Sequence, residues 1–106
     1  KWGRILRDQH GHIIGIREFK DAMASEQEIR EVNPGLYCFR SDWLWKHIPQ
    51  VKNFNAQGEY YLTDLVELAV TQGEEIASIH IDPEECVGVN TPEELAVAEK
   101  IYERNS

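Results

Sequence analysis

The feature that most constrains the fold is a stripe of apolar residues in the second half of the chain. Its members recur at intervals of three and four: Leu62, Leu65, Val66, Ala69 and Val70. This spacing places them on one face of an amphipathic helix that must be buried. Gly73 stands where a glycine commonly ends a helix. The pattern predicts a helix that begins at Glu59, ends at Gly73 and packs on a core.

Two short apolar segments near the N-terminus predict a β-hairpin. Gly3 to Asp8 and Ile13 to Glu18 have strand composition, and His10-Gly11 between them is a tight-turn signal. The polar stretch from Ala22 to Arg30 fits either a short helix or a loop.

The middle of the chain predicts a buried strand followed by a helix. Leu36 to Phe39 is a continuous apolar run bounded by turn residues, as in a strand buried on both faces. Ser41 or Asp42 can cap a helix that Pro49 ends.

The C-terminal third predicts one strand and one helix. Glu75 to Ile81 alternates in the manner of a strand. Thr91-Pro92-Glu93-Glu94 supplies an N-cap, a proline at the first helical position and acids in the first turn, for a helix to about Arg104. We therefore expect an α/β fold with a mixed, partly parallel sheet, helices and a protruding hairpin.

Composition narrows the function classes. The 106 residues fit one small domain or part of one, and 42% hydrophobic residues favour a folded globule. A net charge of −8 disfavours nucleic-acid binding, and no apolar run approaches the roughly 20 residues that cross a bilayer. Cys38 and Cys86 lack zinc-site spacing, and we expect reduced thiols in a cytoplasmic protein.

Several polar residues are candidates for a ligand site. The run Asn55–Asp64 crowds two tyrosines, a threonine, amides and carboxylates into ten positions, which suits a polyhydroxylated ligand. Glu18, Asn33 and Asn90 stand at expected strand ends or turns. Each also has a structural interpretation, because Asn bonds its own backbone in turns and a strand-end Glu is commonly solvated.

Five segments in the same order resemble the sugar nucleotidyltransferase family. They are Gly3-Arg4-Ile5, Glu18-Phe19-Lys20-Asp21-Ala22, Glu31-Val32-Asn33-Pro34-Gly35, Asn55–Asp64 and Val87-Gly88-Val89-Asn90-Thr91. The resemblance is to the C-terminal half of the uridyltransferase (pyrophosphorylase) domain of bacterial bifunctional uridyltransferase/acetyltransferases. It implies a partial Rossmann-like nucleotide-diphospho-sugar transferase fold, with residues 1–106 as its sugar-binding half.

The resemblance also implies site residues. The Gly3 backbone, Glu18 and Asn33 would hold an N-acetylhexosamine. Tyr61 and Thr63 would border its pocket. Asn90 would help to bind a catalytic Mg²⁺, and an amide oxygen is a suitable ligand for that ion. Two departures bear on sugar specificity: Pro34 stands where the family usually has Thr, and Trp2 where it usually has Tyr.

The implied reaction joins UTP and N-acetylglucosamine 1-phosphate into UDP-N-acetylglucosamine and pyrophosphate, for cell-envelope precursor synthesis. The family's G-x-G-T-R-M loop is absent from these 106 residues, so we expect the isolated chain to be inactive. We also expect it to self-associate or to pair with the N-terminal half. The alternatives are a non-catalytic module for sugar-nucleotide binding or assembly, and a nucleotidyltransferase for another sugar 1-phosphate.

Overall fold

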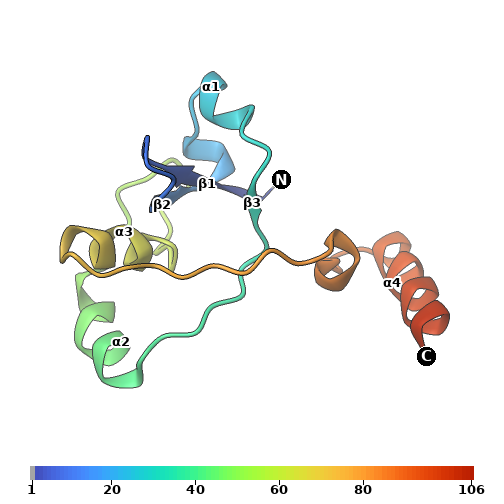
Figure 1. Ribbon diagram of the computed structural model, residues 1–106. Coiled ribbons are helices and arrows are strands. Elements are labelled where there is room, and N and C mark those ends of the chain that lie inside the picture. The colour runs from blue at the N-terminus through green and yellow to red at the C-terminus, as the bar shows by residue number, and fades with distance from the viewer. Residues whose placement is uncertain (1) are drawn as a thin grey trace.

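A computed structural model describes residues 2–106 and shows a small sheet between α1 on one side and α2 and α3 on the other, with a long C-terminal extension (Figure 1). The strands are β1 (Gly3–Arg7), β2 (Ile13–Arg17) and β3 (Val32–Asn33). The α-helices are α1 (Ala24–Gln27), α2 (Ser41–His47), α3 (Asp64–Thr71) and α4 (Pro92–Asn105). Three short 3-10 helices are η1 (Phe19–Asp21), η2 (Ile48–Gln50) and η3 (Pro83–Cys86).

The sheet has the order β2-β1-β3, and both pairings are antiparallel. The expected hairpin of β1 and β2 is confirmed. Its turn is held by the Asp8 carboxylate, which accepts from the backbone N–H groups of His10 and His12 at 2.9 Å each. Gly11 follows with φ of 85°, a conformation that costs a glycine little. The partly parallel sheet that the sequence predicted is wrong for the described strands.

Helix α3 packs on β2 and carries most of the core. Leu65 is fully buried, and Val66 and Ala69 lie beside it, as the apolar stripe predicted. Ile13 of β2 is also buried. The helix begins at Asp64 instead of Glu59, and Gly73 follows it with φ of 81°.

Helices α2 and α3 are joined by one side-chain amide. Gln72, which follows α3, accepts a hydrogen bond from the Trp43 indole N–H at 2.9 Å. Its amide nitrogen lies 2.8 Å from His47 Nε2, while His47 Nδ1 lies 2.7 Å from the Trp43 carbonyl. The carbonyl requires an N–H at Nδ1, so in the neutral ring Nε2 accepts from Gln72. All three side chains are thereby satisfied.

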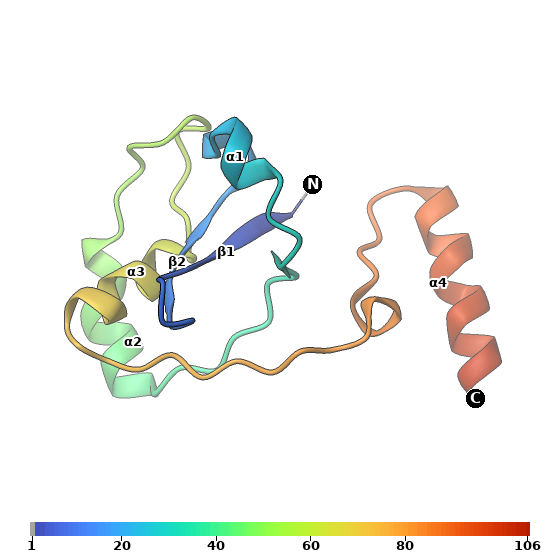
Figure 2. The ribbon, with the colours of Figure 1, turned by 45° about the horizontal axis from the view of Figure 1, so that its top comes forward.

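The C-terminal part extends away from the sheet. After α3 an extended segment leads to η3 and then to α4, which stands apart from the other helices (Figure 2). Thr91 caps α4 by accepting from the Glu94 N–H at 3.1 Å, as predicted. An ion pair between Arg104 and Glu84 ties α4 back to η3.

Two expected strands do not form. Leu36 to Phe39 and Glu75 to Ile81 are extended chain without strand pairing, and Leu36 and Ile79 are 71% and 89% exposed. Apolar content and alternation describe the faces of a strand, but a strand also needs a neighbouring edge to satisfy its backbone. Among the described strands none pairs with either segment.

The stretch from Ala22 to Arg30, which the sequence left open, contains the short helix α1. Both cysteines are free thiols. Among residues 2–106, no helix combines the length and the apolar character that crossing a membrane requires.

Candidate functional site

Five of the six expected site residues are connected by contacts at one end of the sheet, where β1 begins and β2 ends. These five are Gly3, Glu18, Asn33, Tyr61 and Thr63. They come from four separate segments of the chain, so the fold brings them together. The sixth, Asn90, does not join them.

The carboxylate of Glu18 is held by Thr63. Glu18 follows β2 directly, and Thr63 precedes α3 and is 6% exposed. The Thr63 hydroxyl donates to Glu18 Oε1 at 3.0 Å. This bond fixes one carboxylate oxygen and leaves Oε2 available as an acceptor for a ligand hydroxyl or amide.

Gly3 lies where β1 passes closest to β2 and Glu18. A methyl group built on Gly3 would lie 3.2 Å from Ile16 Cγ2, 3.3 Å from the Arg17 carbonyl oxygen and 3.4 Å from Glu18 Oε2. The first two distances are shorter than ordinary contacts and involve rigid neighbours. Glycine therefore lets the strands pack this closely without a shift of their neighbours, and it leaves the backbone open beside the free carboxylate oxygen.

Asn33 pairs with Gly3 across β1 and β3. Its amide nitrogen donates to the Tyr37 hydroxyl, and its amide oxygen accepts from the Gly35 N–H at 3.2 Å. The second bond is the backbone turn that the structural interpretation of Asn33 anticipated. One amide N–H and one oxygen lone pair remain for a ligand.

Tyr61 and Glu18 line a cavity of about 120 Å³. The other lining residues are mostly polar: Ile16, Arg17, Asp21, Phe54, Asn55, Asp64 and Glu67. Small-molecule pockets usually enclose about 300 to 1,000 Å³. This cavity is therefore large enough for one side of a sugar but not for a whole nucleotide sugar.

Carboxylates dominate the electrostatics of this cavity. Burial raises the pKa of Asp64, and the charges of Glu67 and Asp21 raise it further. Burial also raises the pKa of Tyr61, with a smaller contribution from Asp21, although a hydrogen bond of 2.8 Å from Gln57 opposes the shift. An acidic lining favours a ligand that presents hydrogen-bond donors and disfavours a phosphate at this position.

Asp21 connects the cavity to the loop that carries Tyr61. Its Oδ1 accepts from the Ala56 N–H at 2.7 Å. The structural role of Asp21 was not anticipated from the sequence, although the residue lies within the Glu18–Ala22 segment. The sequence signal that could have indicated this role is a carboxylate three positions after Glu18.

Asn90 belongs to the segment between η3 and α4, and Figure 2 shows that this segment lies away from the sheet. Its backbone N–H donates to Glu94 Oε1 at 3.0 Å, which ties the residue to the first turn of α4. Within the described chain, no cluster of three His, Cys, Asp or Glu residues is arranged to hold a metal ion.

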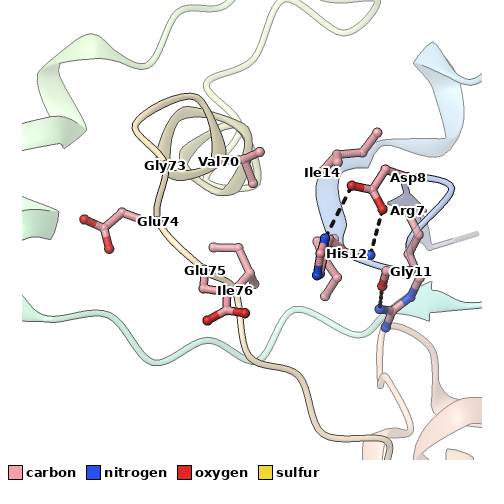
Figure 3. A pocket seen from close by; sticks show the side chains of 11 residues that line it. Arg7, Asp8, Gly11, His12, Ile14, Val70, Gly73, Glu74, Glu75 and Ile76 are labelled. Carbon is pink, nitrogen blue, oxygen red and sulfur yellow. Dashed lines mark hydrogen bonds and ion pairs between the residues drawn. The ribbon is translucent and has the colours of Figure 1, made fainter.

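A larger cavity of about 310 Å³ lies between the hairpin turn and the end of α3 (Figure 3). None of the expected site residues lines it. Its charged groups on the hairpin side are engaged within the chain: Arg7 bonds Glu31 and the Gly11 carbonyl, and Asp8 holds the turn. We assign no ligand to it.

A scan of the sequence against protein-family models found no match. Curated proteins do match it. The chain is 48% identical over 99 residues to the "Bifunctional protein GlmU" of Brevibacillus brevis, and 48% identical over 102 residues to that of Psychrobacter sp.. The protein of the same name from Clostridium kluyveri is 42% identical over 100 residues.

These matches cover 92%, 95% and 94% of this chain and 22% of each relative. The chain thus spans about a fifth of the length of the curated relatives that it matches. By this similarity along nearly its whole length, the chain belongs to the GlmU family and corresponds to part of the length of those relatives.

Proposed function

We propose that this chain forms the sugar-binding wall of a sugar nucleotidyltransferase site. The parent reaction would convert UTP and N-acetylglucosamine 1-phosphate into UDP-N-acetylglucosamine and pyrophosphate. The observation that supports this proposal most directly is the contact between Glu18 and Thr63 beside the open backbone of Gly3. It fixes a carboxylate with one free oxygen at the edge of a polar cavity.

The polar groups fit an N-acetylated sugar. Glu18 Oε2 would accept from a sugar hydroxyl or from the acetamido N–H. The remaining N–H and lone pair of Asn33 would pair with a hydroxyl or with the acetyl carbonyl. Such a site rejects an analogue without the bonded group, because its own polar atoms would lose their partner.

In the proposed reaction a phosphate oxygen of the sugar 1-phosphate attacks the α-phosphorus of UTP. A new P–O bond forms, and the bond between the α-phosphorus and the bridging oxygen breaks, so that pyrophosphate leaves. The described residues would contribute by orienting the sugar, and positioning of this kind supplies much of the rate enhancement in phosphoryl-type transfer.

The triphosphate would bind outside this cavity. Among the described residues that line it, carboxylates outnumber cations and the one basic side chain is that of Arg17. Arg17 already forms an ion pair with Glu26, with its Nε 3.4 Å from the carboxylate. The cationic groups that a triphosphate needs would therefore come from another part of the parent protein.

Magnesium binding is a proposal in which the described residues would supply only part of the ligand set. Asn90 would offer a single amide oxygen, whereas Mg²⁺ usually takes six oxygen ligands including several waters. When bound, the ion would neutralise phosphate charge. No step assigned to the residues above depends on it.

The experiment uses the full-length protein that contains this segment. Pyrophosphate release from UTP and N-acetylglucosamine 1-phosphate is measured for the wild type, for Glu18→Gln and for the control Glu99→Gln at an exposed position of α4. We expect at least about a tenfold loss of kcat/KM in the first variant, from the lost charged hydrogen bonds, and none in the second. Unchanged activity of Glu18→Gln would refute the sugar-site assignment, and activity with another sugar 1-phosphate alone would refute the substrate. The isolated 106-residue chain should release no pyrophosphate.

A second, compatible role is an assembly surface. Several large apolar side chains are widely exposed, among them Leu36, Phe54 and Ile79 at 71%, 88% and 89%. Apolar exposure of this kind marks surfaces that another part of a protein covers. We propose that the rest of the parent protein or a second copy covers them. Sedimentation of the isolated chain tests this, because a monomer at high concentration would contradict association.

A further inference from the structure

The Tyr37 phenol is the most informative group that the proposed function leaves unexplained. It accepts a hydrogen bond from the Asn33 amide nitrogen, while the Asn33 oxygen accepts from Gly35. Both ends of the amide are thus bonded within the chain. The amide plane of Asn33 cannot turn without breaking one of these bonds.

Tyr37 is itself held by a column of aromatic rings. Its ring lies 5.7 Å from that of Phe39, and Phe39 stacks on Trp43 at 6.0 Å with an angle of 4° between the planes. Trp43 stacks on His47 at 4.3 Å, and both are bonded to Gln72 at the end of α3. The column therefore connects the helix that follows Thr63 to the residue that holds Asn33.

The phenol also remains a neutral donor and acceptor. Tyr37 is half-buried, and this burial raises its pKa, with a smaller contribution from the charge of Glu18. The bond from Asn33 acts in the opposite direction.

We propose that Tyr37 is a positioning residue of the sugar site, which orients the Asn33 amide toward the ligand. This inference rests on the proposed function, because it assigns Tyr37 a role only if Asn33 binds the sugar. Tyr37 acts through Asn33 and does not react. The aromatic column transmits to Asn33 the rigidity of α2 and α3.

The test is a double-mutant cycle in the full-length protein, with the dissociation constant of UDP-N-acetylglucosamine as the readout. The variants are Tyr37→Phe, Asn33→Ala and the two combined. Tyr102→Phe, at an exposed tyrosine of α4, is the matched control. We expect Tyr37→Phe to weaken binding about fivefold, the usual effect of losing one neutral hydrogen bond. In the Asn33→Ala background the same change should have no further effect.

The outcomes separate the two proposals. If Asn33→Ala leaves binding unchanged, the proposed sugar site is wrong. If Asn33→Ala weakens binding and Tyr37→Phe does not, or if the two effects simply add, Tyr37 is not a positioning residue. If a variant fails to fold, the wild type provides an independent test. When Asn33 is selectively labelled with ¹⁵N, one of its two side-chain amide protons should be protected from exchange. Two equally unprotected protons would overturn the inference.

Discussion

The Thr63 hydroxyl donates a hydrogen bond to the carboxylate of Glu18, a residue 45 positions away in the sequence. Thr63 stands at the residue before α3, where a threonine commonly caps the helix by accepting from a backbone N–H. Here its side chain makes no such bond. The hydroxyl instead fixes the Glu18 carboxylate at the site. The helix therefore lacks the stabilisation that a side-chain cap from Thr63 would provide.

Replacing Thr63 with valine should therefore weaken both ligand binding and the fold. The variant keeps the volume of the side chain and removes the donor to Glu18. We expect about fivefold weaker binding of UDP-N-acetylglucosamine by the full-length protein and a stability loss of about 1 kcal/mol. Thr71→Val, which removes a hydroxyl bonded to the Leu68 carbonyl in the same helix, is the control and should leave binding unchanged. Equal effects of the two changes on binding would contradict a role for the Thr63 bond.

A methyl group on Gly3 should disturb both the sheet and the site. Gly3→Ala brings Cβ to within 3.2 Å of Ile16 Cγ2 and 3.3 Å of the Arg17 carbonyl oxygen, so the neighbours on β2 must shift by a few tenths of an ångström. Overpacking of this kind costs about 1 to 3 kcal/mol. The matched control is Gly15→Ala in β2, whose nearest neighbour would be Glu67 Oε2 at an ordinary 3.7 Å. In urea unfolding, Gly3→Ala should be clearly less stable than Gly15→Ala. The opposite order would show that the close contact of Gly3 with β2 does not restrict the side chain at this position.

Elements whose signals are local were predictable from the sequence. The hairpin follows from two short apolar segments around His10-Gly11, and α4 follows from the Thr91-Pro92 start. The end of α3 at Gly73 is equally local. In each case one or two neighbouring residues decide the backbone conformation, and tertiary contacts only confirm it.

Elements that depend on distant partners were not predictable. Leu36 to Phe39 has the composition of a central strand, but no described strand pairs with it. The start of α3 was placed too early, at Glu59 instead of Asp64, because Tyr60 and Tyr61 fit a helix as well as a loop. The bond from the Ala56 N–H to Asp21 keeps the preceding loop in place. Composition does not record such bonds.

The site residues show the same division between what local sequence signals predict and what depends on distant contacts. Family resemblance indicated Glu18, Asn33 and Thr63 one at a time, and the fold connects them. A role for Tyr37 was not predicted, because its run of apolar neighbours indicated a buried strand. Its role depends on the turn at Gly35, which returns the chain toward Asn33.

The core should depend strongly on Leu65. It is fully buried between α3 and β2, and only three other apolar side chains among the described residues reach comparable burial. Leu65→Ala should cost about 2 to 5 kcal/mol, because the cavity left behind cannot collapse fully. Leu95→Ala on α4, where the side chain is 48% exposed, should change stability by no more than about 0.5 kcal/mol. Thermal unfolding of both variants checks this, and a similar melting temperature for the two would place the core elsewhere.

Glu31 should make stability depend on pH in the acid range. The Arg7 guanidinium bonds both carboxylate oxygens, at 2.7 and 2.8 Å, and His80 Nε2 lies 2.9 Å from Oε2. The hydrogen bond from Arg7 is the main cause that lowers the pKa of Glu31 from 4.5 to about 2. The folded state thus favours the ionised carboxylate. Its contribution is complete above pH 4.5 and is lost as the pH falls from there to about 2.

The measurement compares wild type and Glu31→Gln by urea unfolding at several pH values between about 7 and about 2, a range that spans both pKa values. Solvent screens this pair, so we expect the variant to be less stable by only about 1 kcal/mol near neutral pH. The difference should shrink below pH 4.5 and be smallest at the acid end of the range, as the pH falls through the folded pKa of about 2 and the carboxyl group becomes neutral like the amide that replaces it. Glu99→Gln on α4 should show no such convergence. A difference between wild type and Glu31→Gln that stays constant over the whole range would mean that the ionised carboxylate of Glu31 does not stabilise the fold.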